Sequence, residues 1–206
     1  MKNIIAILLM LYTQPLFAQL KVTVLDKKDI PPGIHYTGHV VNAARYADKN
    51  GEHIVIASET GENLMKKAPD DNYRKADLFA YNYDVKNTNS MISWQLHDFI
   101  SECPVEIRAN YIPKTFAVTD LDNNGIAEVW LMYTIACRGD VSPATMKIIM
   151  HEGVKKYAIR GTNKVKASEK EFTGGEYTLD DAFKKAPDAF KKYALQLWQK
   201  NLMEKW

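Results

Sequence analysis

A short segment of this chain, 120–128, carries oxygen-bearing side chains at the spacing of a calcium-binding loop. Calcium takes six to eight oxygen ligands, and a tight loop can turn alternate side chains inward while a glycine makes the turn. Here such side chains occupy positions 1, 3, 5 and 9 of the segment, and a glycine occupies position 6. We therefore predict a calcium site whose ligands are Asp120, Asp122, Asn124, Glu128 and the main-chain carbonyl of Ile126.

The same segment admits other interpretations. An EF-hand would require a glutamate at position 12, which is Leu131, and helices on both sides of the loop. The shorter pattern resembles the calcium loops between strands of integrin-type β-propeller blades, but this chain lacks the repeats of a propeller. A plain turn is the alternative to a metal site. Asn124-Gly125 forms a turn by itself, and Asp120 and Asp122 can accept hydrogen bonds from its amides.

Other motifs in the sequence are weaker. The five histidines form no His-Glu-x-x-His pattern, and neither a Gly-x-Ser-x-Gly motif nor a phosphate-binding glycine loop occurs. Carboxylate pairs such as Asp70-Asp71 could serve glycoside hydrolysis, but that chemistry depends on a separation that the sequence does not give. Arg138-Gly139-Asp140 matches the integrin-adhesion tripeptide, and we interpret it as a turn that follows a strand.

The N-terminal residues have the pattern of a secretory signal peptide. Lys2 gives a basic start, an apolar run of about nine residues begins at Ile4, and Ala18 is a small residue at a cleavage position. The apolar run is too short to span a membrane, which takes about 20 residues. We therefore expect residues 1–18 to be removed, and the mature chain to begin at Gln19 in the periplasm, at the cell surface or outside the cell.

The two cysteines are interpreted in the light of that location. An even number of cysteines in an oxidising compartment favours pairing. Neither cysteine has a second cysteine or a histidine at metal-ligand spacing. We predict a Cys103–Cys137 disulfide, which would stabilise the fold by about 3–4 kcal/mol in the chain-entropy model.

Length and composition indicate a single globular domain over residues 19–206. The chain has 206 residues, of which 46% are hydrophobic and 25% are charged. Lys and Arg number 27 against 25 Asp and Glu, so the formal net charge is only +2, which argues against nucleic-acid binding as a property of the whole chain. No stretch of the mature chain approaches the length of a transmembrane segment.

Hydrophobic periodicity predicts an α+β fold that is mainly antiparallel β, built from hairpins in a sheet or sandwich, with a C-terminal amphipathic helix. An Asn50-Gly51 pair predicts the first hairpin turn. Strands are expected at 36–47, 52–59, 79–83, 92–96, 127–136, 145–151 and 156–160. The 127–136 segment is apolar on both faces and is expected to be a central strand. Residues 162–177 are predicted to be a connection or a frayed edge. Helices are expected at about 179–203, with Thr178 as a cap and Pro187 at the start of the second helix.

Several segments together resemble a group of secreted flavobacterial proteins described as surface polysaccharide biosynthesis proteins. The matching segments are 47–56, 94–99, 119–147 and 156–161, followed by the Phe-containing tail helix. The resemblance covers most of the mature chain and implies an association with cell-surface polysaccharide, including lipopolysaccharide. It supplies no catalytic residues. Asn124 stands where the group usually has Asp, which would weaken a calcium site. Gly139 stands where Ser is frequent, so the adhesion tripeptide is incidental.

Three functional hypotheses follow. The first is a non-enzymatic envelope protein that binds surface polysaccharide or assists the proteins that assemble it, favoured by the lack of a nucleophile–base motif. The second is a polysaccharide-modifying hydrolase that uses loop carboxylates, which requires a cleft with two carboxylates about 5–10 Å apart. The third is an adhesion module, which requires Arg138-Gly139-Asp140 at an exposed loop tip.

Overall fold

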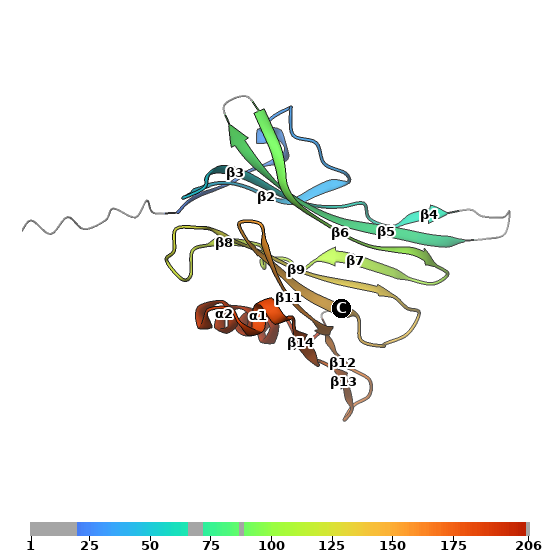
Figure 1. Ribbon diagram of the computed structural model, residues 1–206. Helices are drawn as coiled ribbons and strands as arrows, with labels where there is room; N and C mark the ends of the chain where they lie inside the picture. Colours follow the sequence, from blue (N-terminus) through green and yellow to red (C-terminus); the bar gives the residue numbers. More distant parts are fainter. Residues whose placement is uncertain (1–19, 66–71, 87–88, 205–206) are drawn as a thin grey trace, which may run out of the picture.

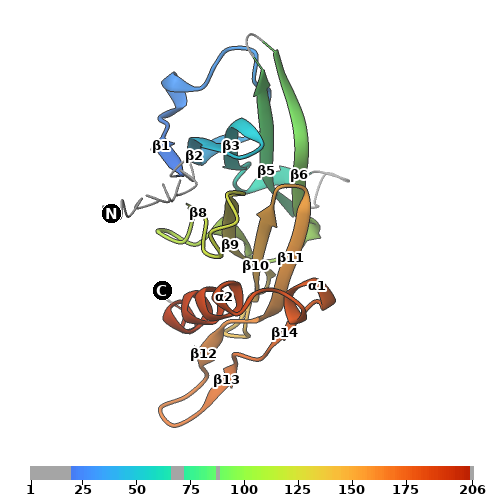
Figure 2. The ribbon, with the colours of Figure 1, turned by 60° about the vertical axis from the view of Figure 1, so that its left-hand side comes forward.

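The computed structural model describes residues 20–65, 72–86 and 89–204. The predicted signal peptide and the Asp70-Asp71 pair lie outside these residues. Within them the fold is mainly antiparallel β with a C-terminal helical segment, as the periodicity predicts. Two antiparallel sheets pack face to face, and the helices cover the far side of the second sheet (Figures 1 and 2).

Sheet A contains the first half of the chain. Its strands are β1 (Lys21–Val24), β2 (His39–Asp48), β3 (Gly51–Glu59), β4 (Asn63–Met65), β5 (Tyr73–Lys86) and β6 (Asn89–Cys103). The order is β1-β2-β3-β5, with β4 and β6 also paired to β5. The predicted first hairpin is confirmed: β2 and β3 are joined by a tight turn in which Gly51 has a φ of +127°. A glycine tolerates that conformation without strain.

Two register shifts distort the pairing of β5 with β6. They fall between Arg74 and Ala76 and between Asn82 and Tyr83 of β5. In both places the partner strand β6 carries the extra residue, and such a bulge bends the strand that contains it. Ser93 is the extra residue at the second shift, where its Oγ accepts a hydrogen bond of 2.8 Å from the side chain of Asn82.

Sheet B contains the second half of the chain. Its strands are β7 (Ile107–Tyr111), β8 (Ala117–Thr119), β9 (Glu128–Cys137), β10 (Thr145–Glu152), β11 (Lys155–Thr162) and β14 (Tyr177–Leu179). The order is β14-β11-β10-β9-β7, and β8 also pairs with β9. The predicted central strand is confirmed, because β9 has strands on both sides and is buried on both faces.

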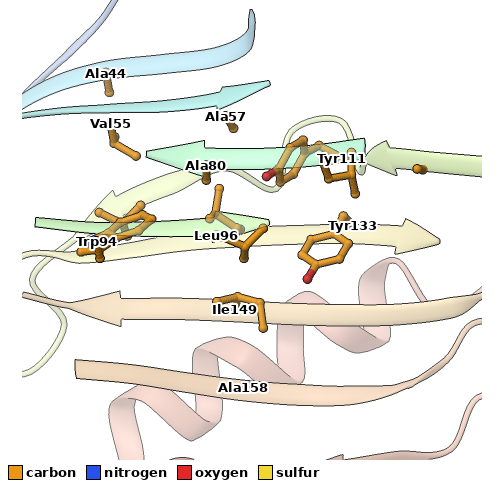
Figure 3. Packing of buried hydrophobic residues seen from close by; sticks show 14 of the residues in the cluster. Ala44, Val55, Ala57, Ala80, Trp94, Leu96, Tyr111, Tyr133, Ile149 and Ala158 are labelled. Atoms are coloured by element: carbon orange, nitrogen blue, oxygen red, sulfur yellow. The ribbon is translucent and has the colours of Figure 1, made fainter. Parts of the chain in front are cut away.

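Small residues allow the two sheets to approach, and larger ones fill the space between them. Ala57 and Ala80 of sheet A face this core, and Trp94 and Leu96 of β6 pack against Tyr133 and Ile149 of sheet B; Figure 3 shows these side chains between the strands. The predicted disulfide is confirmed and joins the same two sheets. Cys103 ends β6 and Cys137 ends β9, with their Cα atoms 5.6 Å apart.

The outer face of sheet B is covered by helices. α1 (Asp181–Lys184) and α2 (Asp188–Lys200) place Phe183, Phe190 and Trp198 against Trp130 and Met132 of β9. The buried stripe of α2 is the one that the spacing predicts. Asp180 caps α1 by accepting a hydrogen bond of 2.8 Å from the Phe183 N–H, so the cap assigned to Thr178 is wrong; Thr178 belongs to β14. Pro187 precedes α2 directly, as predicted.

Residues 162–177 contain more structure than a simple connection. β12 (Lys164–Lys166) pairs with β13 (Phe172–Gly174) in a two-stranded ribbon. The ribbon is fixed to the C-terminal segment, since the Lys164 N–H donates to the Leu202 carbonyl at 2.8 Å. Sequence periodicity did not reveal these two strands, because each has only three residues and the segment is polar.

The outer face of sheet A is covered only in part. The segment 25–36, which includes the 3₁₀ turn η1 (Lys27–Asp29), places Ile30 and Ile34 against Ile54, Ile56 and Tyr81. The part of this face formed by β6 carries exposed side chains, among them Ile92 and Phe99.

Candidate functional site

Three turns meet at one end of the sandwich and form what we call the acidic corner: the β2–β3 turn, the loop 120–127 and the β10–β11 turn. The Lys49 N–H donates to the Gly125 carbonyl at 2.7 Å, and the Ala127 N–H donates to Asp48 Oδ2 at 2.9 Å. A Cβ on Gly153 would lie 3.8 Å from Ile126. The predicted calcium loop of sheet B is therefore held against the first hairpin of sheet A.

A buried histidine holds Asp48 in place at this corner. His53 Nε2 lies 3.1 Å from Asp48 Oδ1, and its Nδ1 lies 2.9 Å from Asp84 Oδ1. The ring also stacks on Tyr46 with centroids 4.8 Å apart. Because Asp48 accepts the Ala127 N–H with its other oxygen, His53 orients a carboxylate that fixes the loop.

The three predicted ligand carboxylates converge in the loop. Oxygen atoms of Asp120, Asp122 and Glu128 all lie within 4.8 Å of one another. Glu128 is fully buried; its carboxylate accepts hydrogen bonds from the Thr119 hydroxyl at 2.6 Å and from the Leu121 N–H. Burial, reinforced by the charges of Asp122 and Asp120, raises the pKa of Glu128 to about 7 despite those hydrogen bonds.

The arrangement fits a hard cation in one further respect. Asp120 Oδ2 accepts a hydrogen bond of 3.2 Å from the Gly125 N–H, whereas its buried Oδ1 has no hydrogen-bond partner among the described residues. A buried carboxylate oxygen without a donor is costly, and a calcium ion would satisfy it. Asp120, Asp122 and Glu128 would be the side chains that hold such an ion.

Asn124 does not join these carboxylates in the same way. Its side-chain oxygen accepts a hydrogen bond of 2.7 Å from the Ile126 N–H, and its amide donates to Asp122 Oδ2 at 3.1 Å and to Glu152 Oε1 at 2.6 Å. The Asn124 N–H also donates to Asp122. A turn braced by aspartates, with no metal, would form the same hydrogen bonds. The hydrogen bonds within the loop are thus compatible with both the metal site and the plain turn.

Sequence reasoning missed Glu152 as a member of the corner. It is the direct cross-strand partner of Glu128 in the β9–β10 pair, and its second oxygen accepts a hydrogen bond of 2.8 Å from the Tyr157 hydroxyl. The signal was present in the predicted hairpin of strands 145–151 and 156–160, in which Glu152 is the first residue of the turn. The register that brings this end beside Glu128 could not be derived from periodicity alone.

The second candidate site lies on the open part of sheet A. Phe79, His97 and Phe99 form a row of stacked rings, which we call the ring row, with centroid distances of 4.4 Å and 5.0 Å. The pairing of Phe79 with His97 and of Asp77 with Phe99 places all three rings on the outer face. Phe99 is 52% exposed. His97 Nε2 lies 2.8 Å from Asp77 Oδ1, which fixes the imidazole between the two phenyl rings.

A cavity of about 470 Å³ lies between β7 and the C-terminal segment. Its carboxylate, Glu204, is buried and accepts hydrogen bonds from both Arg108 and Arg138. The side chain of Arg138 is only 12% exposed. Asp140 bonds to the main chain and the hydroxyl of Ser142. The adhesion tripeptide therefore places its arginine in an internal ion pair.

No protein-family model, curated protein or solved structure matches this chain. Within 20–65, 72–86 and 89–204, none of the helices has the length and apolar composition that crossing a membrane requires.

Proposed function

We propose that this chain is an exported, non-enzymatic protein of the cell envelope that binds surface polysaccharide or assists its assembly. The observation that carries the proposal is the ring row. Exposed aromatic rings on a rigid strand pair provide flat apolar surface at low conformational cost, and the apolar faces of sugar rings stack on such surfaces. The Asp77–His97 pair sets polar groups beside the rings, where sugar hydroxyls can form hydrogen bonds.

Two further features support this role. The disulfide between β6 and β9 is of the kind that forms in oxidising compartments, in agreement with the signal peptide expected at residues 1–18. The segments that resemble surface polysaccharide biosynthesis proteins include 94–99, which contributes His97 and Phe99 to the ring row.

The hydrolase alternative finds less support in the geometry. Glycoside hydrolysis needs two carboxylates that face one cleft. The cavity between β7 and the C-terminal segment offers Glu204, which already accepts hydrogen bonds from Arg108 and Arg138. The three carboxylates of the acidic corner are closer together than an inverting pair, and Glu128 is fully buried. The adhesion alternative is disfavoured by the internal position of Arg138.

We also propose that the acidic corner binds calcium in a structural role. Asp120, Asp122 and Glu128 would supply carboxylate ligands, and the Ile126 carbonyl would be a further ligand. Asn124 would join them only if its side-chain oxygen rotated away from the Ile126 N–H. The ion would offset two of the three negative charges of these carboxylates and fix the loop against the first hairpin. It would act at the end of β9 opposite the disulfide.

Binding to envelope polysaccharide from the native host tests the main proposal. Titration calorimetry would compare the wild-type protein with Phe99→Ala and with Phe172→Ala, a matched control because Phe172 is a phenyl ring on β13 that is 48% exposed. We expect Phe99→Ala to weaken binding at least about tenfold, equivalent to about 1.4 kcal/mol, and Phe172→Ala to leave binding unchanged. Equal affinity of all three proteins, or no binding by the wild type, would refute the proposed function.

A further inference from the structure

A second cavity, of about 330 Å³, opens where the edge strand of sheet A crosses sheet B. Among the described strands β6 pairs with β5 alone, so β6 is an edge of its sheet. Its inward side chains lie over β9 and β10: Trp94 stacks on His151 with centroids 4.1 Å apart, and Asp98 accepts a hydrogen bond of 2.9 Å from the Tyr133 hydroxyl. The cavity, which we call the edge groove, lies between this strand and the inner face of β10 and β11.

The register of sheet B brings cations to the edge groove. Lys147 of β10 is the direct partner of Arg160 on β11, and Lys156 lies on the same face of β11, because side chains two and four residues apart point to one side of a strand. All three residues line the groove. Lys156 and Arg160 are both exposed.

The positive charge of the edge groove is only partly neutralised. Asp98 is the carboxylate that lines it, and it already bonds to the ammonium of Lys147 at 2.5 Å. Lys156 and Arg160 form no ion pair with any described residue, and Asp180 acts on Lys156 only as a nearby charge. Partial burial first, and then the charge of Arg160, lower the pKa of Lys156, while Asp98 opposes the shift.

From this charge and its position we propose that the edge groove binds the anionic groups of an acidic polysaccharide, with Lys156 and Arg160 as the principal contacts. The inference rests on the proposed function and names the class of glycan. Arg160 can hold a carboxylate or a phosphate with two parallel hydrogen bonds, and Lys156 contributes a mobile point charge.

His97 connects the edge groove with the ring row. The residue is part of the groove lining at the edge of β6, and its ring stacks between Phe79 and Phe99 on the outer face. A glycan that lies along β6 can therefore place a sugar ring on Phe99 and the acidic group of a neighbouring sugar in the groove. Gln95 also lines the groove and is exposed, so its amide is available to sugar hydroxyls, whereas the Tyr133 hydroxyl already donates to Asp98.

Binding of defined polymers to the full-length protein tests the inference. Polygalacturonate supplies carboxylates, phosphomannan supplies phosphates, dextran is neutral, and poly-glutamate is an acidic polymer that is not a glycan. The test variant is Lys156→Gln/Arg160→Gln. The control variant is Lys170→Gln/Lys192→Gln, which removes the same charge from two exposed lysines outside the groove. Thermal unfolding of each variant would verify that it is folded.

We expect the wild type to bind polygalacturonate or phosphomannan at least about tenfold more tightly than dextran, with an affinity that falls as salt rises. The groove variant should lose this preference and the control variant should keep it. Whichever of the two acidic glycans binds more tightly identifies the acidic group. Equal loss in both variants, or equal affinity of the wild type for poly-glutamate, would show general charge attraction and overturn the inference.

The same variants separate this inference from the proposed function. If Phe99→Ala abolishes binding of host polysaccharide while the groove variant binds host polysaccharide, polygalacturonate and phosphomannan like the wild type, the ring row is the binding site and the edge groove is not. If the groove variant loses the acidic glycans while Phe99→Ala changes nothing, the groove binds anions and the role of the ring row is refuted.

Discussion

The outer faces of the two sheets differ in what covers them. On sheet B, α1 and α2 bury Phe183, Phe190 and Trp198 completely against β9, β10 and β11. On sheet A the cover is the segment 25–36, which lies over β3 and the adjoining part of β5. Beside it, His97 and Phe99 of the ring row stay exposed, while Phe79 packs against the covered cluster. Aromatic residues of similar type thus stabilise the fold on one face and form a candidate binding surface on the other.

The difference has a simple origin in the order of the chain. The helices follow the last strand of sheet B, and α2 has 13 residues with an apolar stripe long enough to cover several strands. The segment 25–36 lacks a regular helix beyond one 3₁₀ turn and places only a few apolar side chains on sheet A. A short irregular segment covers less of a sheet than a helix does, so part of sheet A remains available for a ligand.

Replacing one phenylalanine on each outer face by alanine should give the largest difference in the free energy of unfolding. We expect Phe190→Ala to lower the free energy of unfolding by about 3–5 kcal/mol, because it leaves a cavity beside Trp130 and Tyr157. Phe99→Ala should change it by less than about 0.5 kcal/mol, since Phe99 is half exposed. Urea unfolding measures both values. A loss from Phe99→Ala close to that from Phe190→Ala would mean that the ring row is structural, and the comparison of the two faces would fail.

The space between the sheets is a third environment. The pH dependence of the free energy of unfolding tests whether His151 is shielded from water there. Burial, with a smaller effect of Lys156, lowers the pKa of His151 to about 4. Between pH 6.5 and pH 4 the unfolded chain binds a proton at this residue that the folded chain does not bind. The contribution of His151 to stability is therefore complete above pH 6.5 and is lost as the pH falls through this window, by about 3 kcal/mol at most.

Urea unfolding at pH 7 and at pH 4.5 checks this prediction. The variant His151→Phe keeps a ring beneath Trp94 and removes the titrating group. We expect this variant to lose less stability on acidification than the wild type does. If both proteins lost the same stability between pH 7 and pH 4.5, His151 would take up its proton in the folded state as well, and water would reach it there.

The smallest expected effect concerns the acidic corner, where loops of the two sheets meet. A metal that binds only the folded state stabilises it by about 1.4 kcal/mol at a tenfold excess over Kd. We expect the melting temperature to rise with millimolar calcium and to return with chelator, and Asp122→Ala to abolish the response. Asp140→Ala is the matched control, because Asp140 also braces a turn by accepting hydrogen bonds two residues on. A wild type that does not respond to calcium would leave the loop as a plain turn.

Much of the fold could be predicted because the signals are local. The Asn50-Gly51 turn, the two-faced apolar run of β9 and the apolar stripe of α2 each depend on residues within one element. The Cys103–Cys137 pair required only the compartment and an even count. The cap at Asp180 was misplaced by two residues, because Thr and Asp are both good caps and the sequence does not show where β14 ends.

The candidate sites were harder to predict because they depend on contacts between elements. The loop at 120–128 was found from its own spacing, whereas the addition of Glu152 depends on the register of β10 with β9. The edge groove forms because β6 of sheet A lies beside β10 and β11 of sheet B, an arrangement that the sequence does not specify locally. Lys156 and Arg160 are unremarkable cations in sequence, and their meeting with Lys147 follows from the β10–β11 register and the end of sheet A at β6.

The bulges of β6 have a consequence for how copies of this protein meet one another. A 15-residue edge strand offers a long row of main-chain donors and acceptors to which a strand of another molecule could add, a common route to aggregation. Both register shifts place their extra residue in β6, so this strand bends near each end of its pairing with β5. A straight strand from a second copy can match only the segment between the bends. The same strand can thus expose its ring row and its groove to a ligand while resisting edge-to-edge assembly with other copies.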